Sequence, residues 1–179
     1  WTTSESTLRP DGKQADAKNQ VKNRLRFQSF DESFVAKEQY AYLMDAPDNH
    51  SSAANYAMGV PAMAALDNGC LLVLEREFLV TPSKFGSYVA NKIYCVDPIQ
   101  SMTISQDKVL DTNSPYMKKV LIATWKTSLS LFHQNLANYE GLCLGPRLMD
   151  GSQVIVLCAD SQDQYGGVLR DWFRTVVIR

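Results

Sequence analysis

The stretch NYEGLCLGPRLMDGSQVIVLCAD, residues 138–160, and its earlier counterpart GVPAMAALDNGCLLVLER, residues 59–76, decide the fold of this chain. Each has a glycine near its start, an apolar run, a turn containing Asp and Gly, and a second apolar run. Asp-Gly and Asn-Gly between apolar runs are strong signals of a β-hairpin. The second run ends in charge, at Glu75 and Arg76 in the early copy and at Asp160 in the late one. The two stretches predict one hairpin used twice.

The rest of the chain is organised as short strands between turn segments. Alternating apolar and polar residues predict strands over residues 21–30, 39–44, 92–97 and 172–178. Residues 118–124 are expected to form a strand or a short helix, and 128–136 a helix. Polar and turn-forming residues predict loops over 1–20 (a loop or arm), 45–56, 78–90, 107–115 and 160–167. About nine short strands with little helix are typical of an all-β sandwich or propeller, and the repeated hairpin favours a partial β-propeller of several antiparallel blades.

Composition sets the outer bounds on function. The chain has 179 residues, of which 45% are hydrophobic and 21% charged, as in one ordinary globular domain. Its formal net charge of -1 predicts no attraction to nucleic acid or to an anionic membrane surface. The longest apolar stretches, such as 154–159, are too short to span a bilayer. The sequence starts at Trp1 and shows no signal peptide, so it does not define the compartment.

The four cysteines show no metal-binding spacing, so a zinc site is not expected. If Asp150 and Gly151 form a two-residue turn, Cys143 and Cys158 lie directly opposite each other across the hairpin. That placement would allow a disulfide. The alternative is two buried thiols that act as small apolar side chains.

Acidic residues at the strand ends are the candidates for chemistry. In a propeller, such residues from several blades gather at the mouth of a central channel, where carboxylates can surround calcium or activate water on an ester. The candidates are Glu75, Glu140 and Asp160, with Asn138 and Asp163 behind them.

Each candidate could instead have a purely structural role, and the sequence is compatible with both. Glu75 or Arg76 could tie neighbouring blades together, and the two side chains point to opposite faces if the strand is regular. Glu140 could close a loop, and Asp160 could form an Asx-turn. There is no GxSxG, no P-loop and no readable Ser-His-Asp arrangement. The aromatic residues are expected in the core or between blades.

With these motifs in place, the chain resembles the phytase-like family, described as the esterase-like activity of phytase domain. The segments SESTLRPDGKQAD (4–16), NRLRFQSF (23–30), KEQYAYLMD (37–45) and KIYCVD (92–97) match in order, together with the two hairpins. The most specific piece is the Asn-aromatic-Glu-Gly hairpin with Gly-Pro and Asp-Gly. Two features depart from the pattern: the chain corresponds to the C-terminal portion of the family domain, and Ser161 follows Asp160 where members often carry Asp.

The resemblance implies a β-propeller and a periplasmic or extracellular protein. It also implies, less directly, hydrolysis of phosphate or other esters. Carried over, the matching positions are Glu5, Glu75, Arg76, Asn138, Glu140 and Asp160. We predict catalytic roles for Glu75, Arg76 and Glu140, substrate binding by Asn138 and Arg147, and calcium ligation by Glu5, Glu75, Glu140 and Asp160.

The alternative function is a non-catalytic propeller that binds a glycan, a peptide or a partner protein. No nucleic acid or membrane span is expected in either case. Because half a propeller leaves open sheet edges, the remainder of the propeller or a second chain is expected to close the fold.

Overall fold

The computed structural model describes residues 1–50, 55–164 and 167–179, and in this part of the chain it contains three antiparallel sheets and one short 3-10 turn. The first sheet has the order β1 (Thr2–Thr3), β2 (Arg24–Phe30), β3 (Ala36–Leu43) and β7 (Thr103–Ile104). The middle sheet has the order β4 (Asn55–Ala65), β5 (Leu71–Val80), β6 (Tyr88–Val96) and β8 (Lys119–Ser128). The last sheet contains β9 (Tyr139–Arg147), β10 (Gln153–Ala159) and β11 (Phe173–Ile178). The 3-10 turn, η1, spans Arg9–Asp11.

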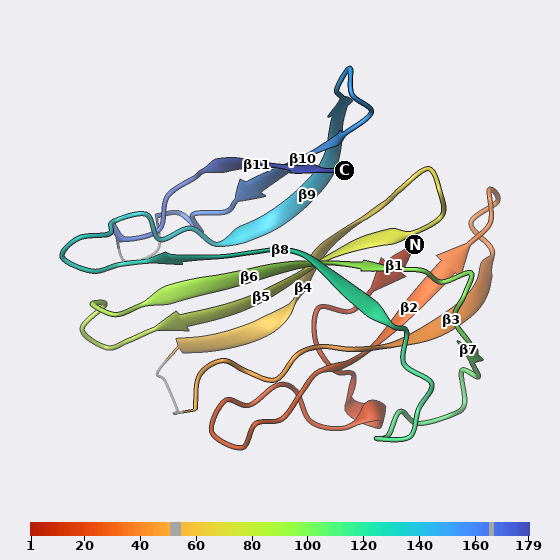
Figure 1. Cartoon of the computed structure of the whole chain (residues 1–179). Coiled ribbons are helices and arrows are strands. Elements are labelled where there is room, and N and C mark those ends of the chain that lie inside the picture. Colours follow the sequence, from red (N-terminus) through yellow and green to blue (C-terminus); the bar gives the residue numbers. More distant parts are fainter. Residues whose placement is uncertain (51–54, 165–166) are drawn as a thin grey trace.

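The middle sheet is packed between the other two (Figure 1). All ten residues of β5 are buried. Leu71 and Val73 pack against the first sheet, whereas Leu72 and Leu74 pack against the last sheet. This follows from the strand's period of two, which sends neighbouring side chains to opposite faces. Stacked antiparallel sheets of this kind are the blades of a β-propeller, so the predicted all-β, partial-propeller fold is confirmed.

The two hairpins share one turn design, as predicted. In the early copy, the Leu66 amide donates to the Cys70 carbonyl and the Gly69 amide to the Leu66 carbonyl. In the late copy, Leu148 and Ser152 form the first of these hydrogen bonds and Gly151 donates to Leu148. Both turns are three-residue loops that end in a left-handed glycine, with φ of 84° at Gly69 and 86° at Gly151.

The two-residue turn expected at Asp150 and Gly151 is therefore wrong, and so is the register derived from it. The extra loop residue and a bulge between Gln153 and Ile155 shift the pairing, so that Cys143 faces Val156 and Cys158 faces Gly141. Cys143 and Cys158 are free and exposed. Neither the predicted opposition of these thiols nor their burial is found.

Several predicted elements differ from the structure. The helix expected over 128–136 is absent: β8 ends at Ser128, and Ser130 Oγ then accepts hydrogen bonds from the next amides in a turn. The loop expected over 78–90 is shorter, because β5 continues to Val80 and β6 begins at Tyr88. The first strand of the early hairpin starts at Asn55. The predicted loops over 45–56 and 160–167 include residues 51–54 and 165–166, which lie outside the described residues.

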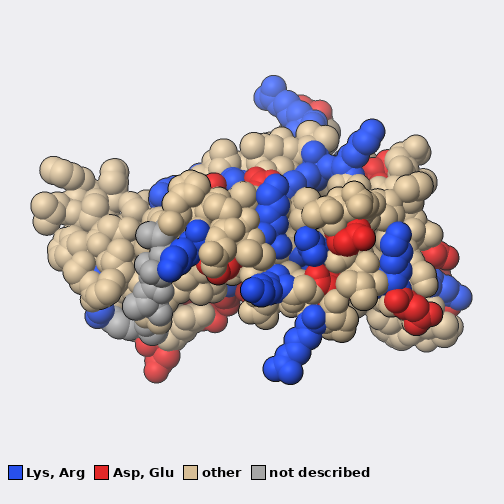
Figure 2. Space-filling view, turned by 90° about the horizontal axis from the view of Figure 1, so that it is seen from below, with Lys and Arg blue, Asp and Glu red and all other residues tan. Residues whose placement is uncertain are grey.

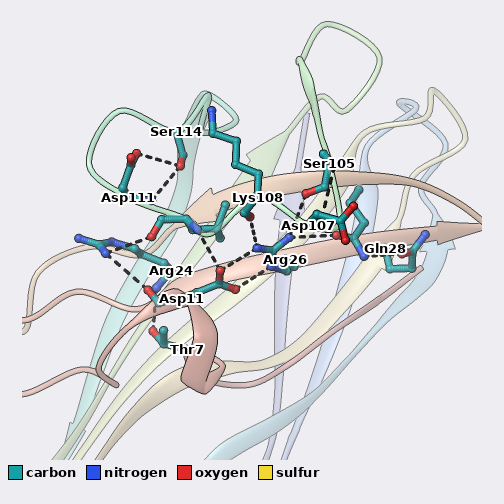
Figure 3. Close-up of polar contacts among 12 residues, drawn as sticks. Thr7, Asp11, Arg24, Arg26, Gln28, Ser105, Asp107, Lys108, Asp111 and Ser114 are labelled. Atoms are coloured by element: carbon teal, nitrogen blue, oxygen red, sulfur yellow. Dashed lines mark hydrogen bonds and ion pairs between the residues drawn. The ribbon is translucent and has the colours of Figure 1, made fainter.

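The outer face of the first sheet is covered by segments that include η1 and residues 105–117. Asp11 is buried and makes a two-point ion pair with Arg26, with Arg26 Nε to Oδ2 at 2.6 Å and Nη2 to Oδ1 at 2.7 Å (Figure 3). The Leu110 amide donates to Asp11 Oδ1 at 2.9 Å. These bonds tie the first residues of the chain to β2. No helix in the described part of the chain has the length and apolar character needed to cross a membrane.

Candidate functional site

Arg76 joins all three sheets. Its side chain leaves β5 on the face opposite Glu75, as the alternation predicted. Nη2 lies 2.5 Å from Glu5 Oε1, and Nη1 donates to Asn138 Oδ1 at 2.5 Å and to Glu140 Oε1. Glu5 follows β1 of the first sheet, while Asn138 and Glu140 lie at the start of β9 of the last sheet. The Arg76 guanidinium therefore brings together four of the predicted site residues. We call these four, Glu5, Arg76, Asn138 and Glu140, the Arg76 cluster.

Glycine at position 59 allows Glu5 to reach Arg76. The Val60 amide donates to the Glu5 carbonyl at 2.9 Å, which draws the chain after β1 against β4. A Cβ at Gly59 would lie 2.5 Å from Glu5 Cγ and 2.6 Å from its carbonyl oxygen. Only a residue without a side chain permits this approach. The glycine at the head of the early hairpin thus serves the cluster as well as the strand.

The Arg76 cluster is buried at its centre and open at its edge. The Arg76 side chain is 5% exposed, whereas that of Glu140 is 30% and that of Glu5 is 53% exposed. Asn138 is fully buried and donates from Nδ2 to Glu140 Oε1 at 2.8 Å. Glu140 Oε1 is therefore held by two donors, while Oε2 accepts no hydrogen bond from the described residues. Arg76 and Asn138 also line a hollow of about 290 Å³ with Tyr56, Phe78 and Gln162.

Glu75 belongs to a different ionic network, on the opposite face of β5. Its carboxylate accepts hydrogen bonds from Tyr42 Oη at 2.6 Å and the Asp45 amide at 3.1 Å, and it pairs with Lys119 Nζ at 2.5 Å. Lys119 also pairs with Asp45 at 2.7 Å, and Tyr94 Oη donates to Asp45 Oδ2 at 2.6 Å. With a side chain only 2% exposed, Glu75 joins the middle sheet to the first. This is the inter-blade tie that the structural explanation for Glu75 predicted.

The pKa values within this network follow from its burial and charges. Burial, and then the negative charge of Glu75, raise the pKa of the Tyr42 hydroxyl far above its usual value. Burial opposes ionisation of Asp45, but hydrogen bonds from Lys119, Tyr94 and Lys92 outweigh it and hold the pKa of Asp45 well below its usual value. The network is thus built around an ionised carboxylate and a protonated phenol.

Glu77 is a buried acid that sequence reasoning missed. Glu77, two residues after Glu75 on the same face, accepts hydrogen bonds from the amides of Asp48 at 2.8 Å and Asn49 at 3.1 Å, and from Tyr56 Oη at 3.1 Å. The alternation that separates Glu75 from Arg76 could have identified it. Its partners in the 45–49 segment could not be read from any periodic pattern.

The remaining predicted residues lie apart from Arg76. Asp160 Oδ1 accepts from the Gln162 amide at 2.8 Å, which is the Asx-turn of the structural explanation, although its own amide donates to the Asn138 carbonyl at 2.9 Å. Asp163 follows in the same loop. Arg147 is at the far end of β9, about 20 Å along the strand from Glu140, and pairs with Asp67 at 2.7 Å between the two hairpin turns.

The four residues predicted to bind calcium do not share one centre. Glu5 and Glu140 both face the Arg76 guanidinium, Glu75 faces Lys119, and Asp160 closes a turn. Calcium prefers six to eight oxygen ligands. Within the described residues there is no group of three or more His, Cys, Asp or Glu placed to hold a metal ion. These donors do not fit calcium as arranged.

Comparison with known proteins supports the resemblance seen in the sequence. The family model described as "Phytase-like: Esterase-like activity of phytase" matches residues 1–162, which include all three sheets except β11. No curated protein and no solved structure gives a significant match. The family match covers most of the chain, and the chain therefore belongs to the phytase-like family.

Proposed function

We propose that this phytase-like protein hydrolyses a phosphate or other ester at the Arg76 cluster, with Glu140 as general base. The supporting observation is the asymmetric environment of the Glu140 carboxylate. Arg76 and Asn138 bind Oε1 and so fix its orientation, while Oε2 is left free on a side chain that is partly open to solvent. A carboxylate held in one orientation with one free oxygen is suited to take a proton from water.

In this proposal, a water molecule loses a proton to Glu140 Oε2 while its oxygen attacks the phosphorus or carbonyl carbon of the ester. The leaving alcohol takes a proton from solvent, and Glu140 then returns its proton to solvent. The hollow beside Asn138 would hold the substrate. Arg76 acts as a positioning residue, because its buried side chain holds Glu140 Oε1. Glu75 has its partners in the separate network on the opposite face of β5 and is given no role in this step.

The test is hydrolysis of a panel of chromogenic phosphate and carboxylate esters, with and without calcium. Glu140→Gln should keep the Arg76 contact and lower kcat by about a hundredfold or more, as expected for loss of a general base. Glu38→Gln, at an exposed carboxylate on β3, is the matched control and should have full activity. Absence of activity on the whole panel, or unchanged kcat in Glu140→Gln, would overturn the proposal.

A second function is favoured by the ion pairs themselves. Glu5 and Glu140 contact an arginine of an adjacent blade, which is the arrangement expected of a non-catalytic propeller that binds a glycan, a peptide or a partner protein. If that is the function, Arg76→Met should lower the melting temperature while wild-type protein hydrolyses none of the esters. A lower melting temperature in Arg76→Met, together with no hydrolysis by the wild type, would indicate that the ion pairs hold the blades together and do not serve catalysis.

We further infer export to the periplasm or the medium, on the strength of the family membership alone. Fractionation of cells that express the natural gene, followed by mass spectrometry, tests it; recovery only in the cytoplasm would contradict it. The remainder of a propeller or a second chain, predicted to close the fold, is likewise a proposal. It is supported by exposed apolar side chains on the last sheet, including Phe173 and Val177.

A further inference from the structure

A second hollow, which shares no lining residue with the Arg76 cluster, is lined by positive charge. It measures about 560 Å³ and lies between residues 13–24 and the segment around 112–116. Its charged lining residues are Lys13, Lys22 and Arg24, and among the described residues no Asp or Glu lines it. Both segments lie at the bottom of Figure 1, and Figure 2 shows several Lys and Arg side chains near the middle of that face, with Asp and Glu side chains among them.

None of these three cations has a carboxylate partner among the described residues. Other cations of the fold do: Arg26 pairs with Asp11, Arg76 with Glu5 and Glu140, and Lys92 and Lys119 with Asp45. The positive charge around the hollow is therefore not used in holding the blades together.

Arg24 shows this contrast most clearly. Its Nη1 donates only to carbonyl oxygens, of Leu110 at 3.2 Å and of Asp11 at 3.5 Å. The nearby Asp11 carboxylate is bound at both oxygens by Arg26. Figure 3 shows the Arg24 guanidinium turned away from that ion pair. Its planar fork keeps donors that can bind an oxyanion at two points.

The walls of the hollow are fixed by hydrogen bonds. Asn23, fully buried, accepts from the Thr7 and Ala15 amides and donates to the Met58 carbonyl at 2.7 Å. Gln20 Nε2 donates to the Ala17 and Asn49 carbonyls at 2.7 and 2.8 Å. A site whose frame is already ordered loses less entropy when it binds a ligand.

We propose that this hollow binds a small molecule carrying a phosphate group, at a site separate from the Arg76 cluster. Three unpaired cations attract a doubly charged oxyanion more strongly than a singly charged one. The volume falls in the range of small-molecule pockets, so it accommodates a phosphate together with the organic group that bears it. Asn19, Gln20, Thr112 and Tyr116 supply polar atoms around the charges.

Binding of inorganic phosphate, measured by isothermal titration calorimetry at constant ionic strength, tests the proposal. We expect saturable binding to wild-type protein. Lys22→Gln, at an exposed side chain that should not affect folding, and Arg24→Gln should each weaken it about tenfold. Lys18→Gln is the matched control, since Lys18 is exposed on the same segment and does not line the hollow.

Three outcomes would overturn the proposal. One is the absence of saturable binding. Another is equal binding in Lys18→Gln, Lys22→Gln and Arg24→Gln, which would indicate a general effect of the salt. The third is loss of binding in Glu140→Gln with retention in Lys22→Gln, which would place the phosphate at the Arg76 cluster. Because the assay measures binding and not turnover, it is independent of whether the Arg76 cluster hydrolyses esters.

Discussion

Arg76 is a buried cation whose surroundings come from three different blades. Breaking a buried ion pair is costly, because it leaves a charge without a partner in a medium of low polarity. Here Glu5, Asn138 and Glu140 supply the partners of the two terminal nitrogens, while the buried Nε has no hydrogen-bond partner among the described residues. At the residue scale, the feature that allows this is the missing side chain of Gly59.

We predict that Gly59→Ala destabilises the protein by about 1 to 3 kcal/mol, the usual cost of overpacking. The new methyl would overlap Glu5 and push the first residues away from β4. Limited proteolysis should then cut within residues 1–8 faster than in wild type. Gly86→Ala is the control: nothing lies near a Cβ there, so it has only the cost of a left-handed backbone and leaves the N-terminal segment protected. Unchanged proteolysis in Gly59→Ala would contradict the role of this glycine.

At the scale of the element, the two hairpins show how one turn design serves two positions. Each loop has three residues and ends in a left-handed glycine. The loops differ in what surrounds that glycine. A Cβ at Gly69 would lie 2.9 Å from Ile99 Cδ1, whereas a Cβ at Gly151 would meet no atom within 4 Å.

This difference predicts a graded response to substitution. Gly151→Asn should cost about 1 kcal/mol or less, because Asn adopts the left-handed region more readily than other residues with side chains. Gly151→Val should cost more, since a β-branched side chain disfavours that region. Gly69→Asn should be worse than Gly151→Asn because Ile99 must move. Urea denaturation of the three variants measures the order, and equal losses at both glycines would show that the backbone angle alone matters.

At the scale of the whole molecule, ionised carboxylates hold the sheets and loops together. Hydrogen bonds from Arg26, against the effect of burial, hold the pKa of Asp11 below its usual value. The pKa of Asp45 is also lowered, as described above. A carboxyl whose pKa is lower in the folded state stabilises the protein above its unfolded pKa, and that contribution is lost as pH falls through the folded value.

We therefore predict that stability declines as pH falls below about 4, the ordinary pKa of Asp. Denaturation by urea across this range measures the decline. Asp11→Asn should remove about 3 kcal/mol at neutral pH, as for other broken buried pairs. It should also make the acid decline shallower, because one titrating group is gone. An acid decline in Asp11→Asn as steep as in wild type would exclude Asp11 as a contributor.

Local physics accounts for what sequence reasoning predicted correctly. Alternation in residues 71–76 indicated a strand with Glu75 and Arg76 on opposite faces, and Asp, Asn and Gly at the turns indicated the repeated hairpin. These features depend on neighbouring residues alone. The error in register at Cys143 and Cys158 came from one extra loop residue and a bulge, which shift every pair beyond them.

The sequence by itself determined most of the strands, the places of the two hairpin turns and the face to which each side chain of β5 points, because these depend on backbone periods and glycine conformations. Only the tertiary structure decided which charges meet. Arg76 binds residues far away in both directions of the chain, and Glu75 pairs with Lys119. Among the described residues, Lys13, Lys22 and Arg24 have no acidic partner. Such pairings depend on how whole sheets stack, and no local pattern encodes the distance between two blades.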